Sequence, residues 1–245
     1  MSKAYDLVVL GGGPAGLVLT LGAASLGARV ALIEKHKLGG DCLNYGCVPS
    51  KALLRAAHVA HTARQAKRFG VDTGEVSVNL GRVMDYVQSR IDTIGVHDRP
   101  ENFEKAGAEV IFGSPSFRDG RSLEVDGRVL PFKNCAICTG TAPFVPPAAR
   151  RVPHHTNETI FGVRELPGRL LVLGGGPIAC ELSQGFARFG SKVTLVVRGD
   201  RILKREDPEA AQVVLGRFRK EGIDLRTGLD LESVPASGKG GFQRA

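Results

Sequence analysis

The apolar positions of this chain fall into short unbroken runs, and two of these runs open the same sequence phrase. Residues 7–10 form an apolar run that leads into a turn of sequence Gly-Gly-Gly-Pro-Ala-Gly, and a second, mostly apolar run over 28–34 ends in Glu34. Small residues fill the interval, and the regular spacing favours a helix there. Short apolar runs are typical of buried strands in parallel sheets. The pattern predicts strand, glycine turn, helix and strand.

The same phrase returns, with Gly174 repeating Gly11 at an offset of 163 residues. An apolar run over 170–173 leads to a second glycine turn, a helix over 181–190 and a strand over 192–198. A further helix over 208–220 and a short strand over 223–225 follow. We therefore expect an α/β protein with two Rossmann-like dinucleotide-binding units, the second of them incomplete.

The first glycine turn has the composition that a dinucleotide site requires. Gly11 and Gly13 allow a tight turn that brings a pyrophosphate close to the N–H groups at the helix start. Gly16 lets the helix pack closely on the strand, and Glu34, about twenty residues on, can accept hydrogen bonds from ribose hydroxyls. The strand, turn, helix and acid together predict dinucleotide binding.

The second turn differs at the position that reads the ribose. Val197 stands where Glu34 stands in the first copy, and four basic residues follow: Arg198, Arg201, Lys204 and Arg205. Loss of the carboxylate removes its repulsion of a ribose 2′-phosphate, and an arginine can bind that phosphate through several donors. We expect NADPH rather than NADH at this site; the alternative is a basic turn exposed to solvent.

Two cysteines five positions apart form the candidate redox centre. On a regular helix, Cys42 and Cys47 would be separated by about 7.5 Å of rise, more than the roughly 4.4–6.8 Å Cα spacing of a disulfide. Gly46 and Pro49 both favour a distorted helix entry, which could bring the sulfurs together. Lys51 lies one turn beyond Cys47, and a positive charge there favours a thiolate. The alternative is two separate cysteines in a helical bend.

The composition argues against nucleic acid and membranes as binding partners. The chain has 245 residues, 42% of them hydrophobic, which is enough for two domains with cores. Its net charge is +8, but Lys and Arg are scattered and aromatic residues are only 6%, so we expect no nucleic-acid partner. Glycines interrupt the apolar segment 7–31, so we expect no membrane partner. Five cysteines without a secretory segment favour the cytoplasm.

The remaining cysteines and histidines are expected to be structural. Cys135 and Cys138 fall on a predicted strand, where residues three apart point to opposite faces. We therefore expect them, and Cys180, to be core thiols, and we expect no metal site. His58 and His61 fall on the helix after Lys51, and we expect both at the surface.

Residues 39–51, of sequence Gly-Gly-Asp-Cys-Leu-Asn-Tyr-Gly-Cys-Val-Pro-Ser-Lys, stand between the two glycine turns. With Thr-Asn-Glu-Thr-Ile-Phe at 156–161 and Gly-Gly-Gly-Pro-Ile-Ala-Cys-Glu-Leu at the second turn, this order resembles the N-terminal half of the class I pyridine nucleotide-disulfide oxidoreductases. That family includes mercuric reductase, to whose branch the wording is most similar, and dihydrolipoamide dehydrogenase. The resemblance implies an FAD-binding domain with a redox-active disulfide over 1–165, the first half of an NAD(P)-binding domain over 166–231 and a flexible tail over 232–245.

The resemblance also implies residue roles. Cys47 would touch the flavin and Cys42 would exchange with substrate, while Lys51 would lie beside the flavin and pair with Glu181. These four residues are the expected catalytic set. The expected cofactor-binding residues, which surround FAD and NADP (NAD being the second choice), are Gly11, Gly13, Pro14, Ala15, Gly16, Glu34, Lys35, Gly40, Asp41, Gly46, Lys51, Thr139, Gly140, Gly174, Gly176, Pro177, Ile178, Glu181, Arg198 and Lys204.

The expected function is that of an FAD-dependent NAD(P)H:disulfide oxidoreductase that reduces a small-molecule, dithiol or disulfide substrate. The family's members are homodimers, and the interface domain that supplies a His–Glu pair across the dimer has no counterpart in this sequence. Pro177 stands where several relatives have a tyrosine, and Asp41 replaces the usual threonine. The alternatives are a truncated or split non-catalytic nucleotide-binding module and a thiol-based metal-binding protein.

Overall fold

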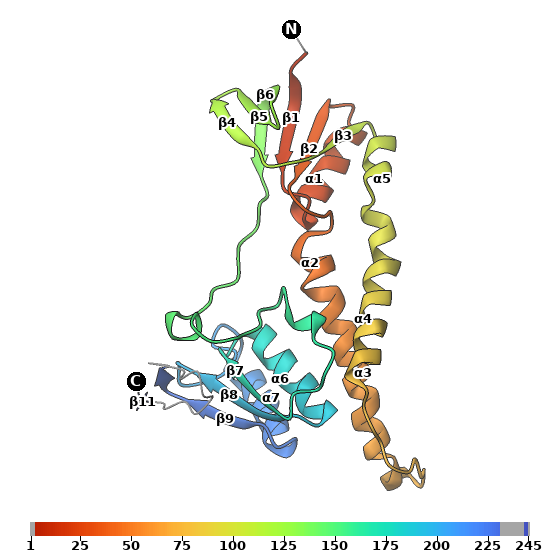
Figure 1. Ribbon diagram of the computed structural model, residues 1–245, viewed down its shortest axis with the longest axis vertical. Helices are drawn as coiled ribbons and strands as arrows, with labels where there is room; N and C mark the ends of the chain where they lie inside the picture. The colour runs from red at the N-terminus through yellow and green to blue at the C-terminus, as the bar shows by residue number, and fades with distance from the viewer. Residues whose placement is uncertain (1–2, 231–242, 245) are drawn as a thin grey trace. The chain divides into compact units, whose positions relative to one another are not determined.

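The computed structural model describes residues 3–230 and 243–244 (Figure 1). Contacts divide the chain into two units: Met1–Val48 with Ser89–Ala142, and Pro49–Gln88 with Pro143–Ala245. The division falls inside helices α3 (Cys47–Arg64) and α4 (Leu80–Gly95). The predicted tail over 232–245 lies outside the described residues, except for the two-residue strand β11 (Gln243–Arg244).

The sheet of the first unit has the order β3-β2-β1-β6-β5-β4. Its parallel part comprises β1 (Tyr5–Leu10), β2 (Val30–Glu34), β3 (Ala108–Phe112) and the section of β6 (Arg128–Ile137) that pairs with β1. Val8 lies opposite Ala31 on one side and Cys135 on the other. Strands β4 (Ser116–Asp119) and β5 (Ser122–Val125) extend it with antiparallel pairing. The parallel strands place their carboxyl ends at one edge, where α/β proteins bind ligands.

The core of this unit lies on both faces of the sheet, because side chains alternate along each strand. Val8 and Ile33 belong to one buried cluster, whereas Val9 and Leu32 belong to a second cluster that includes Leu17 of α1 (Pro14–Ser25). The remaining helices of this unit are α2 (Gly40–Asn44), the 3₁₀ turn η2 (Val96–Asp98) and α5 (Pro100–Lys105).

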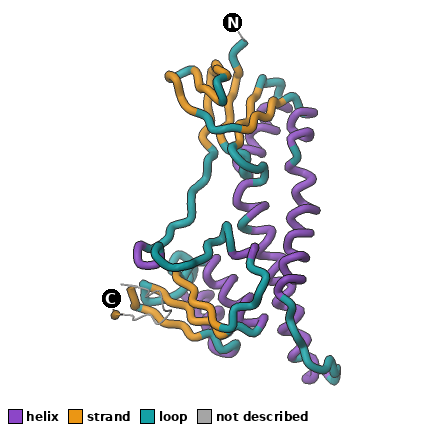
Figure 2. Tube along the Cα trace, in the orientation of Figure 1, coloured by secondary structure: helices purple, strands orange, loops and turns teal. Residues whose placement is uncertain are grey.

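The second unit has a parallel sheet of order β7-β8-β9 among the described residues (Figure 2). Its strands are β7 (Arg169–Leu173), β8 (Lys192–Val197) and β9 (Asp224–Thr227), and its helices include α6 (Pro177–Phe189) and α7 (Pro208–Lys220). Strand β10 (Leu229–Asp230) pairs with β11, and the 3₁₀ turns are η1 (Ala66–Phe69), η3 (Pro147–Ala149) and η4 (Ile160–Gly162).

Local sequence explains most of the helix boundaries. Helix α7 spans the predicted 208–220, because Pro208 is preorganised for the first helical position and the Asp207 side chain caps the N–H groups of Glu209 and Ala210. Helix α6 begins at Pro177, earlier than the predicted 181, for the same reason that proline suits a helix start. The predicted α/β fold with Rossmann-like units is confirmed.

The two copies of the repeat have matching backbones. Gly11 and Gly174 have φ angles of 105° and 115°, and each donates its N–H to the strand across the turn. The N-cap residues Gly13 and Gly176 both have φ of −81°. The internal repeat predicted from the sequence is therefore also a repeat of conformation. Within the described residues no helix combines the length and the hydropathy needed to cross a bilayer.

Candidate functional site

The first glycine turn is built by close backbone contacts that exclude side chains. A Cβ added to Gly11 would lie 2.4 Å from the carbonyl oxygen of Cys138, and one added to Gly16 would lie 1.9 Å from the carbonyl oxygen of Gly11. Gly11 also has a positive φ that favours glycine. These contacts leave the N–H groups at the start of α1 accessible for a pyrophosphate, with Pro14 and Ala15 exposed beside them.

The Glu34 carboxylate is fixed at the end of β2. One of its oxygens accepts a hydrogen bond from the Gly12 N–H at 2.7 Å, and the other accepts from the His36 N–H at 2.8 Å. Each oxygen keeps further lone pairs, so the carboxylate can still accept from ribose hydroxyls. Lys35 follows it and is exposed.

The segment that carries the cysteines is attached directly to the glycine turn. The Gly39 N–H donates to the Gly12 carbonyl oxygen at 2.8 Å. Gly40 has a φ of 53°, and a Cβ there would lie 2.6 Å from the Cα of Gly13. Asn44 closes the segment by donating to the carbonyl oxygens of Leu38 and Gly40. Helix α2 therefore begins against the predicted pyrophosphate-binding turn, with Asp41 exposed in its first turn.

The helix is interrupted between the two cysteines, as predicted. Cys42 lies in α2, which ends at Asn44, and Cys47 is the first residue of α3. A Cβ on Gly46 would lie 2.9 Å from the carbonyl oxygen of Asp41 and 3.4 Å from the Cα of Cys42. The chain thus folds back on itself just before Cys47, whose thiol is exposed.

The position of Pro49 is compatible with a new helix that starts at Cys47. It occupies the first turn of α3, where its missing N–H has no helical partner to lose. A Cys42–Cys47 disulfide is a proposal about the oxidised protein.

Thr139 and Gly140 follow β6 beside the same turn. The Cys138 N–H donates to the Leu10 carbonyl oxygen at 2.7 Å, which aligns the end of β6 with the end of β1. Gly140 has a φ of 65°, and both residues are exposed. The ends of β1, β2 and β6 thus bring a glycine cradle, a carboxylate and an open turn to one edge of one sheet. This set of groups fits a dinucleotide such as FAD.

Cys135 and Cys138 pack on opposite faces of this sheet, as predicted. Cys135 packs against the cluster that contains Val8, and Cys138 packs against the cluster that contains Val9. Burial raises the pKa of Cys135, with a smaller contribution from Cys138. Among the described residues, no group of three or more His, Cys, Asp or Glu side chains is arranged to hold a metal ion.

The second glycine turn is more open than the first. A Cβ on Gly174 or Gly176 would meet nothing within 4 Å, and Pro177 and Ile178 are exposed. Ala179 stands at the position of Gly16, so helix and strand leave room for a methyl group here. Gly175 is the crowded residue of this turn, since its Cβ would lie 2.7 Å from the side chain of Val197.

The basic residues after β8 have different surroundings. Arg198 and Lys204 are exposed. The Arg201 guanidinium instead donates to the carbonyl oxygens of Leu203, Lys204 and Glu206. These hydrogen bonds stabilise the loop between β8 and α7. Arg198 and Lys204, together with the exposed Arg205, therefore present their charges to solvent.

Lys51 and Glu181 both lie in the second unit, on α3 and α6. These helices meet closely, because a Cβ on Gly185 would lie 2.6 Å from the side chain of Leu53. Lys51 is exposed and Glu181 is half-buried. Among the ion pairs of the described residues, none joins Lys51 to Glu181.

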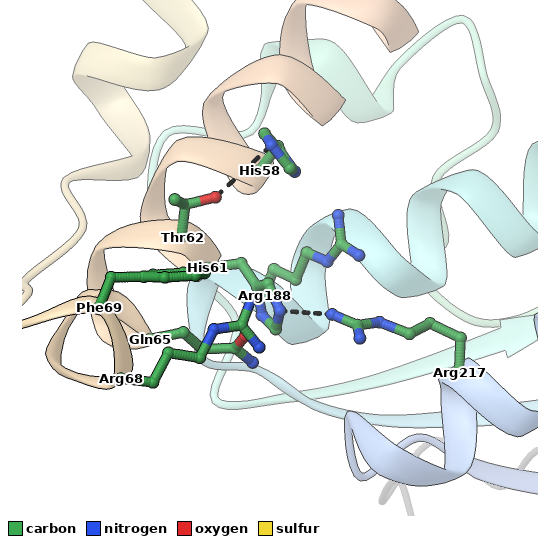
Figure 3. A pocket seen from close by; sticks show the side chains of 8 residues that line it. All are labelled: His58, His61, Thr62, Gln65, Arg68, Phe69, Arg188 and Arg217. Atoms are coloured by element: carbon green, nitrogen blue, oxygen red, sulfur yellow. Dashed lines mark hydrogen bonds between the residues drawn. The ribbon is translucent and has the colours of Figure 1, made fainter.

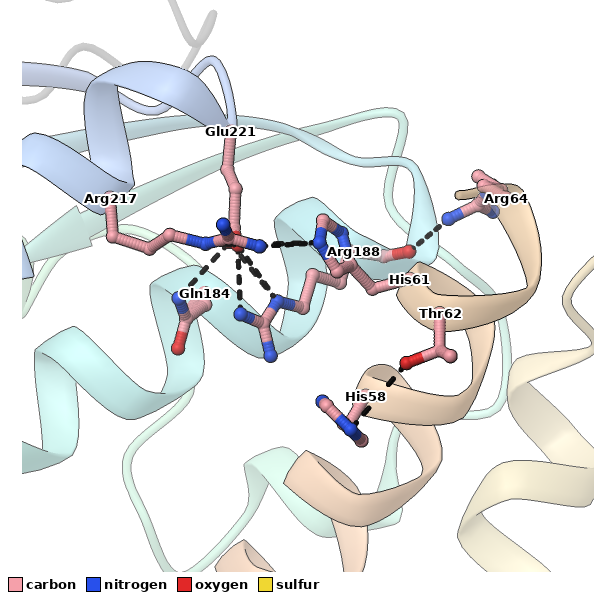
Figure 4. Close-up of polar contacts among 8 residues, drawn as sticks. All are labelled: His58, His61, Thr62, Arg64, Gln184, Arg188, Arg217 and Glu221. Atoms are coloured by element: carbon pink, nitrogen blue, oxygen red, sulfur yellow. Dashed lines mark hydrogen bonds and ion pairs between the residues drawn. The ribbon is translucent and has the colours of Figure 1, made fainter. Parts of the chain in front are cut away.

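Sequence reasoning missed a polar cluster in the second unit. A cavity of about 140 Å³ is lined by residues of α3, η1, α6 and α7 (Figure 3). Beside it, the Glu221 carboxylate accepts from Arg188 at 2.8 Å, from Arg217 at 2.5 Å and from Gln184 at 3.1 Å (Figure 4). Arg217 also lies 2.5 Å from Nε2 of His61. The contacts join three helices, which no local motif could reveal.

Burial and charge shift the pKa values in this cluster. Burial disfavours the ionised form of Glu221, but hydrogen bonds from Arg188 and Arg217 outweigh it and lower the pKa of Glu221 below its ordinary value. Burial also lowers the pKa of His61, although the Glu221 charge opposes the shift. His61, predicted at the surface, is in fact half-buried because α3 packs against α6 and α7, whereas His58 is exposed as predicted.

Comparison with known proteins places this geometry among redox enzymes. Residues 5–242 match the family described as pyridine nucleotide-disulphide oxidoreductase. A mercuric reductase of Shigella flexneri is 38% identical over 92% of this chain and 41% of its own length. A dihydrolipoyl dehydrogenase of Bacillus subtilis (strain 168) is 37% identical over 93% of this chain and 51% of its own length. The chain thus spans about half or less of the length of these curated relatives.

Two solved structures have a similar fold over most of this chain. The HOCl-induced flavoprotein disulfide reductase RclA from Escherichia coli superposes with a TM-score of 0.77 at 29% identity, covering 94% of this chain and 50% of that one. LpdA from Mycobacterium tuberculosis superposes with a TM-score of 0.83 at 25% identity, covering 93% of this chain and 52% of that one.

Proposed function

Because the chain belongs to the pyridine nucleotide-disulphide oxidoreductase family, we propose that it carries electrons from NADPH, through bound FAD, to a disulfide between Cys42 and Cys47. The resulting dithiol then reduces an oxidised small molecule or a disulfide. The contact between Gly40 and Gly13 carries this proposal. It sets the helix that holds Cys42 directly against the turn suited to a dinucleotide.

The first unit supplies the FAD-binding groups. The N–H groups after Gly13 bind the pyrophosphate, and Glu34 accepts from the ribose hydroxyls. Thr139 and Gly140 line the open end of the turn. Bound FAD supplies a two-electron carrier between nicotinamide and sulfur.

The cysteines accept the electrons as a pair. Two electrons and two protons convert the Cys42–Cys47 disulfide to two thiols, and NADPH provides a hydride while solvent provides the remaining proton. By the family resemblance, Cys47 would lie beside the flavin and Cys42 would attack the substrate as a thiolate. By the family resemblance, Lys51 would supply positive charge near the flavin and Glu181 would balance that charge.

The nicotinamide nucleotide is NADPH in this proposal. The apolar Val197 replaces the acid that would repel a 2′-phosphate. Arg198 and Lys204 are exposed at the end of β8 and just beyond it, so both can reach a phosphate. Arg201 is excluded from this role because its donors hold the loop.

The second candidate is a non-catalytic nucleotide-binding module, which would use the first glycine turn to hold FAD without any redox step at the cysteines. Assembly into a homodimer and a location in the cytoplasm are further parts of our proposal for the whole protein, motivated by the family resemblance and by cysteines suited to a reducing compartment.

The decisive experiment is anaerobic reduction of the purified chain reconstituted with FAD. We expect NADPH to bleach the flavin absorbance, and the accessible thiols to increase by those of one disulfide. NADH should act more slowly, and Arg198→Ala should reduce the preference for NADPH. Cys47→Ser should abolish the gain in thiols, whereas the matched variant Cys135→Ser should keep it. Retention of FAD without bleaching would favour the non-catalytic module.

A further inference from the structure

The cavity between α3, η1, α6 and α7 has an unusual charge balance. Five of its eight lining side chains are basic, and none is acidic. The basic residues are His58, His61, Arg68, Arg188 and Arg217 (Figure 3). The cavity lies wholly within the second unit, and neither glycine turn lines it. It is therefore a feature separate from the proposed redox site.

The neighbouring carboxylate offsets only part of this charge. Glu221 has a side chain that is 5% exposed, and its oxygens accept from Arg188 and Arg217. One negative charge thus faces the three guanidinium charges of Arg68, Arg188 and Arg217. The C-terminal turns of α3, α6 and α7 each add about half a negative charge nearby, so together they offset most of the remaining positive charge. By this count a small positive excess is left beside the cavity.

The lining groups present donors. The Arg68 guanidinium carbon lies 4.6 Å from the ring centroid of Phe69, within cation–π distance, and the guanidinium has five N–H donors. Arg217 donates to Nε2 of His61, so the His61 hydrogen is on Nδ1 when the ring is neutral. The Thr62 hydroxyl and His58 complete the wall with groups that can donate to an anion.

We propose that this cavity binds a small tetrahedral oxyanion of the phosphate class, held by Arg68, Arg188 and Arg217. Arginine donors match phosphate oxygens in geometry and charge. A water molecule occupies about 30 Å³ in the liquid, so a volume of about 140 Å³ accommodates a phosphate-sized group with some water beside it. The same chemistry is available from free phosphate or from the phosphoryl end of a larger molecule.

The test is calorimetric titration of the full chain with sodium phosphate, against sodium chloride at equal ionic strength and without flavin or nicotinamide. We expect saturable binding of phosphate. Arg68→Gln should weaken it about tenfold, which corresponds to about 1.4 kcal/mol. Arg55→Gln is the matched control, because Arg55 is exposed on α3 and does not line the cavity. The phosphate affinity of this variant should equal that of the unchanged chain.

A second readout follows His61 by NMR. A bound anion should raise the pKa of His61 in the unchanged chain and raise it less in Arg68→Gln. Adenosine monophosphate separates the two sources: competition with phosphate identifies the phosphoryl end of a larger molecule, and its failure to compete identifies the free ion. Absence of saturable binding, or equal loss in both arginine variants, would overturn the proposal and show that the arginines only hold Glu221 and the helix ends. Because Arg68 lines the cavity and belongs to neither glycine turn, the effect of Arg68→Gln is independent of the redox proposal.

Discussion

Gly16 faces the Gly11 carbonyl oxygen so closely that a Cβ would lie 1.9 Å from it. Another glycine of α1, Gly22, is exposed and would place its Cβ within 4 Å of nothing. The helix therefore contains a matched pair of glycines, one required by the turn and one that is not.

Replacing these two glycines by alanine should have opposite effects. Gly16→Ala forces α1 away from β1, and we expect a loss of about 1–3 kcal/mol in unfolding free energy, as in other overpacked sites. FAD affinity should fall as well. Gly22→Ala should gain up to about 1 kcal/mol, because alanine favours a helix interior over glycine. Urea unfolding and FAD titration measure both effects; equal stability of the two variants would contradict the close-contact role of Gly16.

Glu221→Gln should destabilise the second unit. It leaves the largely buried Arg188 guanidinium without its charged partner, and breaking a buried pair typically costs about 3–5 kcal/mol. We expect the lower end, about 3 kcal/mol, because the Arg217 side chain is 41% exposed. The exposed Glu209→Gln on α7 is the control and should change stability little.

The effect of Glu221 should depend on pH in one direction. Its pKa in the folded protein lies below the ordinary 4.5, so its ionised form stabilises the fold above that pH. The contribution is lost as the pH falls through the folded-state pKa. Urea unfolding between pH 7 and pH 3 should show the variant and the unchanged chain converging in acid. A constant difference across this range would contradict the ion-pair origin.

Cys47 and Cys180 should differ sharply in thiol reactivity. Cys47 is exposed, whereas Cys180 is buried. Burial, with a smaller contribution from Glu181, raises the pKa of Cys180 to about 11. At pH 8 only about one Cys180 side chain in a thousand is then a thiolate, the reactive form. Maleimide labelling of the reduced chain, read by peptide mass spectrometry, should modify Cys47 first and Cys180 only after denaturation. Equal labelling rates would contradict this assignment.

Thr20 and Ser183 occupy the same position in the two copies of the repeat, and both have a buried hydroxyl oxygen without a hydrogen-bond partner. Thr20→Val keeps the shape of the side chain and removes the hydroxyl, so we expect a gain of about 1 kcal/mol. The control is Thr93→Val on α4, whose hydroxyl donates to the Ser89 carbonyl oxygen at 2.7 Å. That change should destabilise the chain; a gain there as large as at Thr20 would mean that the missing partner is not the cause.

The sequence was most informative where one residue decides the backbone conformation. Gly11 and Gly174 require positive φ angles, so the two turns and their repeat could be predicted. Gly46 and Pro49 indicated the break between the cysteines, and there the glycine is required by its close contact with the Asp41 carbonyl oxygen rather than by a positive φ. Helix α6 starts at Pro177, before the predicted start at 181, because the apolar pattern alone does not show that Pro177 is the first helical residue.

Side-chain partners brought together by tertiary packing could not be predicted. Arg201 belongs to the basic group after β8, yet only the folded loop directs its donors to three carbonyl oxygens. Likewise His61, Arg188 and Glu221 come from distant positions on three elements. Neither periodicity nor spacing indicates that they meet.

The interruption at Tyr45 and Gly46 has a mechanical consequence for the cysteines. Cys42 belongs to a helix of a single turn, and Cys47 begins a helix of 18 residues. In the proposed redox cycle, a bond between their sulfurs would therefore join two separate helices across Tyr45 and Gly46. Neither helix would have to contain the bond within its own turns.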